Sequence, residues 1–280
     1  MKKLKRSARL VEMTQYLLER PHTLIPLTTF AERYQSAKSS ISEDLAIIKE
    51  VFESEGIGEL LTLAGAAGGV KYIPRQPKSA SLAFIRRLCG QLEQPERILP
   101  GEYLYMSDLL SYPSLTNEVG KMFASAFGGQ EIDVVMTVET KGIPLAYATA
   151  AYLNLPVVIV RRDNRVTEGS VVSINYVSGS SKRIQTMSLA RRALKEQSRV
   201  LIIDDFMRAG GTVKGMMDLL QEFKASVVGV GVLVESGEVE EHLVDDYISL
   251  ARLSGVDFKT RQLTVAPGNY FDEEEGNRTL

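Results

Sequence analysis

Residues 200–212 have the sequence VLIIDDFMRAGGT, which predicts a buried strand, a glycine-rich turn and the start of a helix. Residues 200–203 are apolar without alternation, as expected for a parallel strand that is covered on both faces. Two adjacent acids, Asp204 and Asp205, end this apolar run, and a turn follows at 208–212. Apolar residues then recur at helical spacing. We therefore expect an α/β fold with a covered parallel sheet.

The turn at the end of this strand has the features of an anion-binding site. Free backbone N–H groups at the start of a helix, the helix dipole and glycines that let the backbone approach closely all favour a phosphate. The two acids suit ribose hydroxyls or a metal ion that they hold. Other phosphate motifs fit less well, because the sequence has no Gly-Lys-Ser/Thr triplet and Gly229 and Gly231 lie inside an apolar run. An ordinary strand–helix turn with capping acids is the alternative.

The composition is that of a soluble protein with one large and one small domain. The 280 residues are 24% charged and 44% hydrophobic. No apolar run is long enough to span a bilayer, and the basic start lacks the apolar core of a signal peptide. The single cysteine, Cys89, excludes an intramolecular disulfide and suits the reducing cytoplasm. With only two histidines, His22 and His242, a histidine-based metal site is not expected, and we assign no metal ligands.

The first seventy or so residues predict a small DNA-binding domain. Helical spacing covers residues 7–20, 26–34 and 38–53, and two β-like runs at 60–63 and 70–73 follow. Three short helices and a hairpin are the layout of a winged helix-turn-helix, whose third helix enters the major groove of DNA.

The residues expected to contact DNA come from the basic N-terminal arm, the start of the third helix and the hairpin. Cations and small hydroxyl donors are the groups that reach phosphates. Alternatives are a solvated arm, a winged helix that binds protein, and a capping box at Ser40 and Glu43 that merely starts the helix. The predicted DNA-binding residues are Lys2, Lys3, Lys5, Arg6, Arg9, Lys38, Ser39, Ser40, Ser42 and Lys71.

A linker at 74–80, PRQPKSA, is predicted to separate a domain at 1–74 from a second at 75–280. In the second domain apolar strands alternate with helices, which predicts a parallel sheet that binds its ligand at the carboxyl ends of the strands. The expected strands are 132–138, 155–160, 200–203 and 227–234, and the expected helices are 115–127, 143–153 and 213–223.

Three loops are expected to meet at that edge of the sheet. The first, 139–142, combines a lysine with a glycine, and the third is 204–212. The second is a long excursion at 161–189, rich in serine and glycine around 178–183 and with two cations there. We interpret it as a mobile loop that closes over the ligand, and a surface hairpin is the alternative. Arg161 and Arg162, where this excursion begins, are expected to add charge, and a solvated strand end is the alternative.

The stretch at 200–212 resembles the phosphoribosyl-pyrophosphate (PRPP) signature of the type I phosphoribosyltransferases. With a winged helix before it, the whole chain resembles the purine operon repressors of Gram-positive bacteria. The resemblance covers essentially the full length. The segments that carry it are SAKSSISEDL at 36–45, AGAAGGVKYIP at 64–74, VVMTVETKGIP at 134–144 and VSINYVSGSSKRIQTMSLA at 172–190.

The resemblance implies a cytoplasmic, homodimeric transcriptional repressor of purine biosynthesis genes. It would bind double-stranded operator DNA and be released by PRPP with Mg²⁺, with no required cofactor, no membrane and no catalytic residues. The acids would hold the ribose hydroxyls, 209–212 the 5′-phosphate and 140–142 the pyrophosphate, with 178–183 as the closing loop. The implied PRPP-binding residues are Tyr103, Thr140, Lys141, Gly142, Ser178, Gly179, Ser180, Ser181, Lys182, Arg183, Asp204, Asp205, Phe206, Met207, Arg208, Ala209, Gly210, Gly211 and Thr212.

Two other functions, an enzyme and an RNA-binding protein, are the alternatives to a DNA-binding repressor. Phe206, Met207 and Arg208 are bulkier than the small residues usual in the enzymes, which argues against nucleobase turnover. The main alternative is nevertheless an active purine phosphoribosyltransferase with an attached DNA-binding domain. An RNA-binding attenuator on the same fold would not need the winged helix. The cations Lys141 and Lys182, with Arg208, also suit a guanosine alarmone such as ppGpp at the same site.

Overall fold

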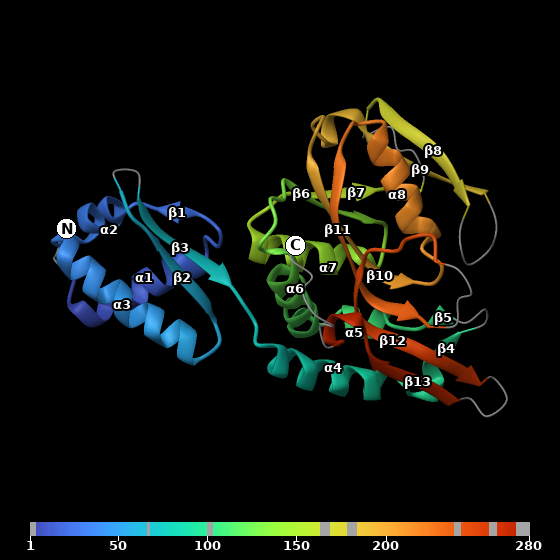
Figure 1. Cartoon of the computed structure of the whole chain (residues 1–280), viewed down its shortest axis with the longest axis horizontal. Coiled ribbons are helices and arrows are strands. Elements are labelled where there is room, and N and C mark those ends of the chain that lie inside the picture. Colours follow the sequence, from blue (N-terminus) through green and yellow to red (C-terminus); the bar gives the residue numbers. More distant parts are fainter. Residues whose placement is uncertain are drawn as a thin grey trace.

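The computed structural model describes residues 4–65, 68–99, 103–162, 169–177, 184–237, 242–257 and 262–272. It consists of a small N-terminal unit of helices with a short sheet and a larger unit built on a wide sheet (Figure 1). Within the described residues, no helix is long and apolar enough to cross a membrane.

The N-terminal unit is a winged helix, as the sequence predicts. A buried core that includes Met13, Phe30, Ile41 and Leu60 holds its helices on a sheet of order β1-β3-β2. Strand β1 was not predicted, because a strand of two residues leaves no periodic signal. The elements are α1 (Arg6–Leu18), β1 (Leu24–Ile25), α2 (Leu27–Tyr34), α3 (Lys38–Ser54), β2 (Gly58–Leu63) and β3 (Gly69–Pro74).

A buried ion pair joins α1 to α3, which corrects the expected role of Arg9. The Asp44 carboxylate is fully buried and accepts hydrogen bonds from Arg9 Nε and, at 2.9 Å, from Arg6 Nε. Arg9 is only 8% exposed, so it lies inside the fold and not in a free basic arm. Arg6 belongs to the first turn of α1, and its half-exposed side chain pairs with the same carboxylate. Spacing alone could not show this, because Asp44 is distant in sequence.

The start of α3 contradicts the capping-box interpretation. The helix begins at Lys38, its N-cap is Ala37, and no side chain caps it. Ser40 therefore lies within the first turn, three residues after the N-cap, where it is partly exposed. Of the other predicted DNA contacts, Lys38, Ser39, Ser42 and Lys5 are exposed and Lys71 is partly buried on β3, whereas Lys2 and Lys3 lie outside the described residues.

The predicted linker at 74–80 is partly wrong. Pro74 still belongs to β3, and α4 (Lys78–Leu92) begins two residues before the expected end of the linker. The first buried residue of α4 is Ser81, so its opening turn shows no apolar periodicity. The exact domain boundary at residue 74 stays a prediction.

The larger unit is an α/β fold on a six-stranded sheet of order β13-β12-β11-β10-β6-β7. All neighbouring pairs are parallel except β12 and β13, so the expected parallel sheet is confirmed and gains an antiparallel edge. The strands are β6 (Val134–Val138), β7 (Val157–Val160), β10 (Arg199–Met207), β11 (Ser226–Ser236), β12 (Ile248–Asp257) and β13 (Gln262–Pro267).

Helices cover both faces of this sheet. On one face α4, α6 (Pro113–Phe127) and α7 (Gly142–Leu153) pack in one core with β6 and β10. On the other face α8 (Gly211–Gln221) packs in a second core. The shorter elements are η1 (Pro95–Arg97), β4 (Ile98–Leu99), β5 (Tyr103–Leu104), α5 (Ser107–Leu110), η3 (Arg191–Ala193) and η4 (Asn269–Phe271).

The strand of the signature is longer than predicted. It continues past the apolar run to Met207, because β11 pairs with it as far as Met207 and Glu235. Asp204 and Asp205 are therefore strand residues and share the rigidity of the sheet. Two further strands, β12 and β13, were also not predicted; in β12 Arg252 and Ser254 interrupt the apolar pattern, and β13 is short.

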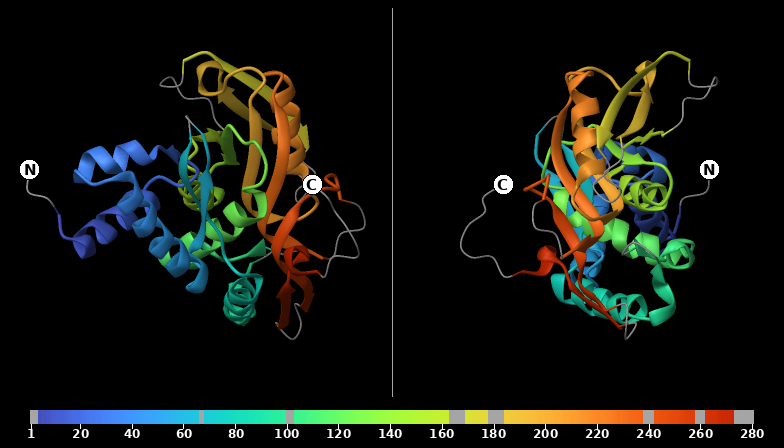
Figure 2. Two further views of the ribbon diagram at one scale, coloured as in Figure 1. Left: turned by 60° about the vertical axis from the view of Figure 1, so that its left-hand side comes forward. Right: turned by 90° about the vertical axis from the view of Figure 1, so that its right-hand side faces the viewer.

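The excursion at 161–189 is not a structureless loop over its full length. Its arms form a β-hairpin, β8 (Val171–Val177) and β9 (Ile184–Ala190), which lies beside α8 (Figure 2). Contact is close, because a Cβ on Gly215 of α8 would lie 2.9 Å from Tyr176 Cγ. The alternative of a surface hairpin thus describes the arms, whereas residues 178–183, expected to close over PRPP, lie outside the described residues.

Candidate functional site

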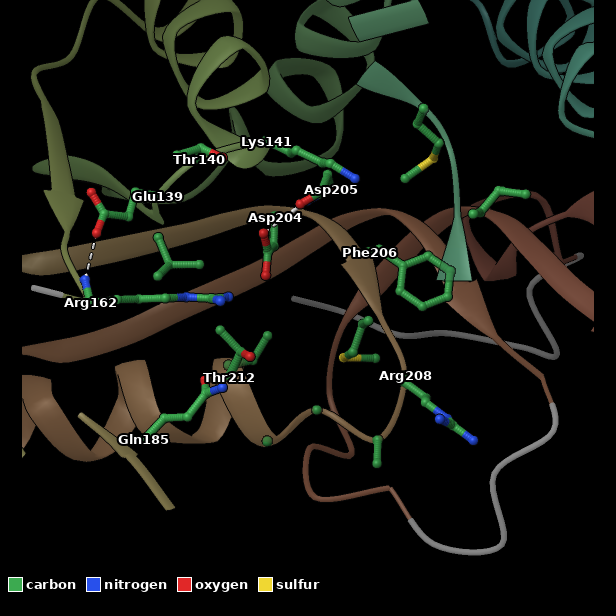
Figure 3. A pocket seen from close by; sticks show the side chains of 18 residues that line it. Glu139, Thr140, Lys141, Arg162, Gln185, Asp204, Asp205, Phe206, Arg208 and Thr212 are labelled. Carbon is green, nitrogen blue, oxygen red and sulfur yellow. Dashed lines mark hydrogen bonds between the residues drawn. The ribbon is translucent and has the colours of Figure 1, made fainter. Parts of the chain in front are cut away.

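A cavity of about 430 Å³ opens at the carboxyl ends of β6 and β10. Three segments that the sequence analysis placed at this edge meet there: 139–141 before α7, the acids of β10, and the turn before α8 (Figure 3). Its lining residues are Leu104, Met106, Val138, Glu139, Thr140, Lys141, Arg162, Gln185, Asp204, Asp205, Phe206, Met207, Arg208, Ala209, Gly210, Gly211, Thr212 and Val213.

The two acids form a pair in the cavity, with Asp204 buried and Asp205 partly buried. Asp204 is 4% exposed, and its Oδ1 accepts the backbone N–H of Asp205 at 2.9 Å. Burial, and then the neighbouring Asp205 charge, raise the pKa of Asp204 well above its ordinary value. Burial also raises the pKa of Asp205, although Lys141 and Arg162 favour its charged form. A ligand that brings hydroxyl donors or a cation would stabilise the ionised pair.

The turn before α8 presents a helix N-terminus to the cavity. Gly210 is the N-cap and has φ +81°, a left-handed conformation that glycine adopts without strain. The turn is held from outside, because Leu243 N donates to Ala209 O at 2.9 Å and a Cβ on Gly210 would lie 3.2 Å from Val244 Cγ2. A rigid turn with free N–H groups at a positive dipole end suits a phosphate.

The loop at 139–142 approaches the acids as closely as its backbone allows. A Cβ on Gly142 would lie 2.3 Å from Thr137 Oγ1 and 3.0 Å from Asp204 Oδ1, so this position requires glycine. The peptide bond between Glu139 and Thr140 is cis. Gly142 also opens α7, so the loop combines the cation Lys141 with a second helix N-terminus.

Arg162 and Gln185 enter the cavity from the excursion. The Glu139 carboxylate accepts the backbone N–H of Arg162 at 2.7 Å and Arg161 Nη1 at 3.3 Å. Figure 3 shows the Arg162 side chain directed between Asp204 and Thr212. Gln185 comes from β9 and accepts a hydrogen bond from Tyr176 Oη at 2.7 Å. Arg162 was predicted only as added charge. Gln185 was not predicted, because the segment that forms β9 was interpreted as a loop.

Apolar residues form another part of the cavity wall. Leu104 and Met106 line it together with the partly buried Phe206. Tyr105, between the first two, is held by Arg97, whose Nη1 donates to Tyr105 O at 3.0 Å and to Asp108 Oδ1 at 2.7 Å. Leu104 and Met106 have no sequence signal, because they look like ordinary core residues.

Most of the residues assigned to PRPP therefore meet in one place. Thr140, Lys141 and 204–212 line the cavity, and Gly142 lies against Asp204. Tyr103 belongs to β5, and its side chain is outside the described part of the chain, as are all of residues 178–183. Ligand binding at these positions stays a prediction.

Two family models match this chain. The model described as "Bacterial purine repressor, N-terminal" matches residues 5–74, and that described as "Phosphoribosyl transferase domain" matches residues 106–263. The chain is 63% identical over 268 residues to the purine biosynthesis transcriptional repressor PurR of Bacillus subtilis (strain 168), covering 96% of this chain and 94% of that protein. It is 42% identical over 271 residues to the purine biosynthesis transcriptional activator PurR of Lactococcus lactis subsp. lactis (strain IL1403), covering 97% and 100%.

Solved structures agree with the fold of the larger unit. An adenine phosphoribosyltransferase from Thermoanaerobacter pseudethanolicus superposes with a TM-score of 0.52 and 20% identity, over 59% of this chain and 98% of that one. At this identity the likeness concerns the fold alone.

Proposed function

Because this chain belongs to the family of bacterial purine repressors, we propose that it represses purine biosynthesis genes as a homodimer whose operator binding is relieved by PRPP. The winged helix would bind the DNA, with the exposed start of α3 in the major groove. PRPP, together with Mg²⁺, would occupy the cavity at the carboxyl ends of β6 and β10.

The observation that carries this proposal is the meeting of three kinds of group in one cavity. The Asp204 and Asp205 carboxylates suit the ribose hydroxyls, the turn at 209–212 suits the 5′-phosphate, and the loop at 139–142 suits the pyrophosphate. Carboxylate and phosphate oxygens are also the ligands that Mg²⁺ prefers. PRPP carries all the matching groups on one molecule.

A sensor fits the cavity better than a transferase does. Phe206 and Arg208 are bulky side chains of the cavity wall that follow the acid pair directly. They take up room beside the ribose position, where an enzyme must admit a nucleobase. Incubation with PRPP and each purine base tests the enzyme alternative, since measurable pyrophosphate release would favour it.

Reciprocal titration tests the repressor function. PRPP is titrated with and without saturating operator, and operator with and without saturating PRPP, at fixed Mg²⁺ and salt. Linkage requires the two affinity ratios to be equal, and coupling between sites is typically about 5- to 150-fold. A PRPP affinity that is indifferent to operator would remove PRPP as the inducer. In vitro transcription from a purine promoter gives the sign of regulation, since one relative is named an activator.

The same cavity is proposed to accept ppGpp, because its diphosphates would meet the same cation, Lys141, and the same helix N-termini. Competition at equilibrium distinguishes the possibilities. If saturating ppGpp leaves PRPP binding unchanged, the two ligands do not share the cavity.

A further inference from the structure

The winged helix and the α/β unit are joined by direct contacts as well as by the chain between them. Asn154 Nδ2 donates to Thr23 Oγ1 at 3.0 Å, and Lys121 Nζ donates to Gly56 O at 3.4 Å. Next to them Gln76 Nε2 donates to Glu118 Oε2 at 2.9 Å. The contacts on the α/β side therefore come from α6 and from the end of α7.

On the DNA-binding side one of these contacts reaches the turn that ends α3, and the other reaches the turn before β1. Gly56 directly follows the C-cap of α3 and has φ +63°, so its carbonyl direction is fixed by a tight turn. Thr23 lies in the turn between α1 and β1, next to the third strand of the winged-helix sheet. A shift of α6, or of α7 packed against it, would thus act on the end of the predicted recognition helix through the Lys121–Gly56 contact.

On the ligand side α7 begins in the wall of the cavity. Its first residue, Gly142, is packed against Asp204, and its C-cap is Asn154. Twelve helical residues span about 18 Å, so one rigid element connects the loop at 139–142 with the winged helix.

The two helices are packed tightly enough to move together. A Cβ on Gly120 of α6 would lie 2.6 Å from the carbonyl carbon of Ala148 in α7, which means near backbone contact. Such close packing transmits a displacement and does not absorb it.

We propose that α6 and α7 couple the effector cavity to the DNA-binding domain, with Asn154 and Lys121 as the positioning residues at the contact. A phosphate group bound at 139–142 pulls on the first turn of α7, and the contacts with Thr23 and Gly56 pass this displacement to α3. The inference rests on the proposed function, since it needs two ligands whose binding is linked.

Some buried polar atoms near this contact lack hydrogen-bond partners, as we expect for a contact that opens. Within the described residues, the buried atoms His22 Nε2 and Gln76 Oε1 have no hydrogen-bond partner. Lys121 is half-buried, and burial lowers its pKa. Unpaired buried polar groups cost free energy, which lowers the free energy needed to separate the two surfaces.

Three variants each remove one group of the contact, and of these Thr23→Val also removes the hydrogen bond from Thr23 Oγ1 to Pro21 O at 3.3 Å. Asn154→Gly removes the amide but keeps the left-handed C-cap, where Asn154 has φ 56°. Thr23→Val removes the hydroxyl from the other side of the same hydrogen bond, and Lys121→Met keeps the apolar stem without the charge. The matched control is Gln197→Gly, because Gln197 is also exposed and left-handed at φ 63° but belongs to the η3–β10 turn.

The readout is the coupling factor, which is the ratio of PRPP affinities without and with saturating operator. We expect each contact variant to lower this factor by about 2- to 30-fold while PRPP affinity without DNA stays as in the parent. Gln197→Gly should keep the parent factor. If the parent shows coupling and the contact variants keep the parent factor, this inference is wrong but the proposed function stands. A parent without coupling would overturn the proposed function, and the inference with it. Since Asn154→Gly and Thr23→Val break one bond from two sides, misfolding of one variant leaves the other to decide.

Discussion

Asp44 of the winged helix and Asp204 of the α/β unit are both almost fully buried, at 0% and 4% exposure, yet their surroundings are opposite. Asp44 accepts hydrogen bonds from two arginines, Arg6 and Arg9. Asp204 lies beside a second carboxylate, that of Asp205, and its pKa is raised. A buried acid that the fold itself neutralises holds elements together. A buried acid next to another acid costs stability and indicates a site where a ligand completes the electrostatics.

The largest effect is expected for Asp44→Ala. This change leaves Arg9 buried without its partner, and breaking a buried ion pair on one side typically costs about 3–5 kcal/mol. The free energy of unfolding of the winged helix, measured by urea denaturation, should fall by that amount.

The double variant Arg9→Met with Asp44→Leu is the control for this prediction. Replacing both charges by apolar side chains of similar size is often close to neutral. If Asp44→Ala proves as stable as the parent, the pair is not buried as the structure has it, and Arg9 returns to the predicted DNA contacts.

Asp204→Asn should have the opposite sign on stability. It removes a buried charge next to Asp205, so the ligand-free protein should become more stable at neutral pH, whereas PRPP affinity should fall by about 1.5–3 kcal/mol through loss of charge-assisted hydrogen bonds. Calorimetry with PRPP and urea denaturation measure the two effects. An Asp204→Asn protein that is less stable and binds PRPP normally would make Asp204 a structural acid like Asp44.

The pH dependence of the same variant sharpens this test. Because the folded pKa of Asp204 is raised, its contribution to stability is present below about pH 4 and is lost as pH rises through the raised value. Asp204→Asn should weaken that loss. The control is Asp133→Asn: Arg199 lowers the pKa of Asp133 to about 2, so its contribution is lost on acidification instead.

A smaller effect is expected from the glycine that lies against Asp204. Gly142→Ala places a Cβ 2.3 Å from Thr137 Oγ1, and overpacking of this kind costs about 1–3 kcal/mol. It should also weaken PRPP binding, because the loop at 139–142 has to move away from the acids. Gly129→Ala is the matched control, since a Cβ there meets no atom of the described structure within 4 Å. Equal unfolding free energies for the two variants would mean that the loop yields without cost.

The elements that were predicted have a regular spacing of apolar residues. Those that were missed depend on contacts with segments distant in sequence. The winged helix and the parallel strands follow from the spacing of apolar residues. The glycine turn follows from a backbone conformation that only a few residue types adopt. The arms of the hairpin at β8 and β9 were missed because they were interpreted, together with the serine- and glycine-rich stretch between them, as one loop. Their packing on α8 through Tyr176 and Met187 depends on a partner that is distant in sequence. The same holds for β12, whose arginine, Arg252, binds the buried Glu235 at 2.8 Å.

The site residues that were predicted are those whose type is unusual for their position in the sequence. Acids, glycines and a lysine after strands point to a phosphate and a sugar, and these residues line one cavity. Leu104 and Gln185 were not found, because nothing in their type or spacing sets them apart. The structural role of Arg9 was hidden for a related reason, since a cation within a basic cluster looks exposed until its buried partner is known.

The smallest effect is expected from the cations of the basic N-terminus. Arg6 and Arg9 bind Asp44, which leaves Lys2, Lys3 and Lys5 as the other cations of the arm that are predicted to reach DNA phosphates, and Lys2 and Lys3 are tested as a pair. Each phosphate contact adds about 0.9 to the slope of log affinity against log salt concentration. The variant Lys2→Ala with Lys3→Ala should therefore lower that slope by up to about 1.8. Its free energy of unfolding should equal that of the parent, whereas Arg9→Met should lose stability. Fluorescence anisotropy with operator DNA and with an unrelated duplex, at several salt concentrations, gives the slopes. Because phosphate contacts carry no sequence information, the two slopes should fall together and the ratio of the two affinities should stay constant. An unchanged slope would show that the arm is solvated, and a changed affinity ratio would show that its lysines reach base edges.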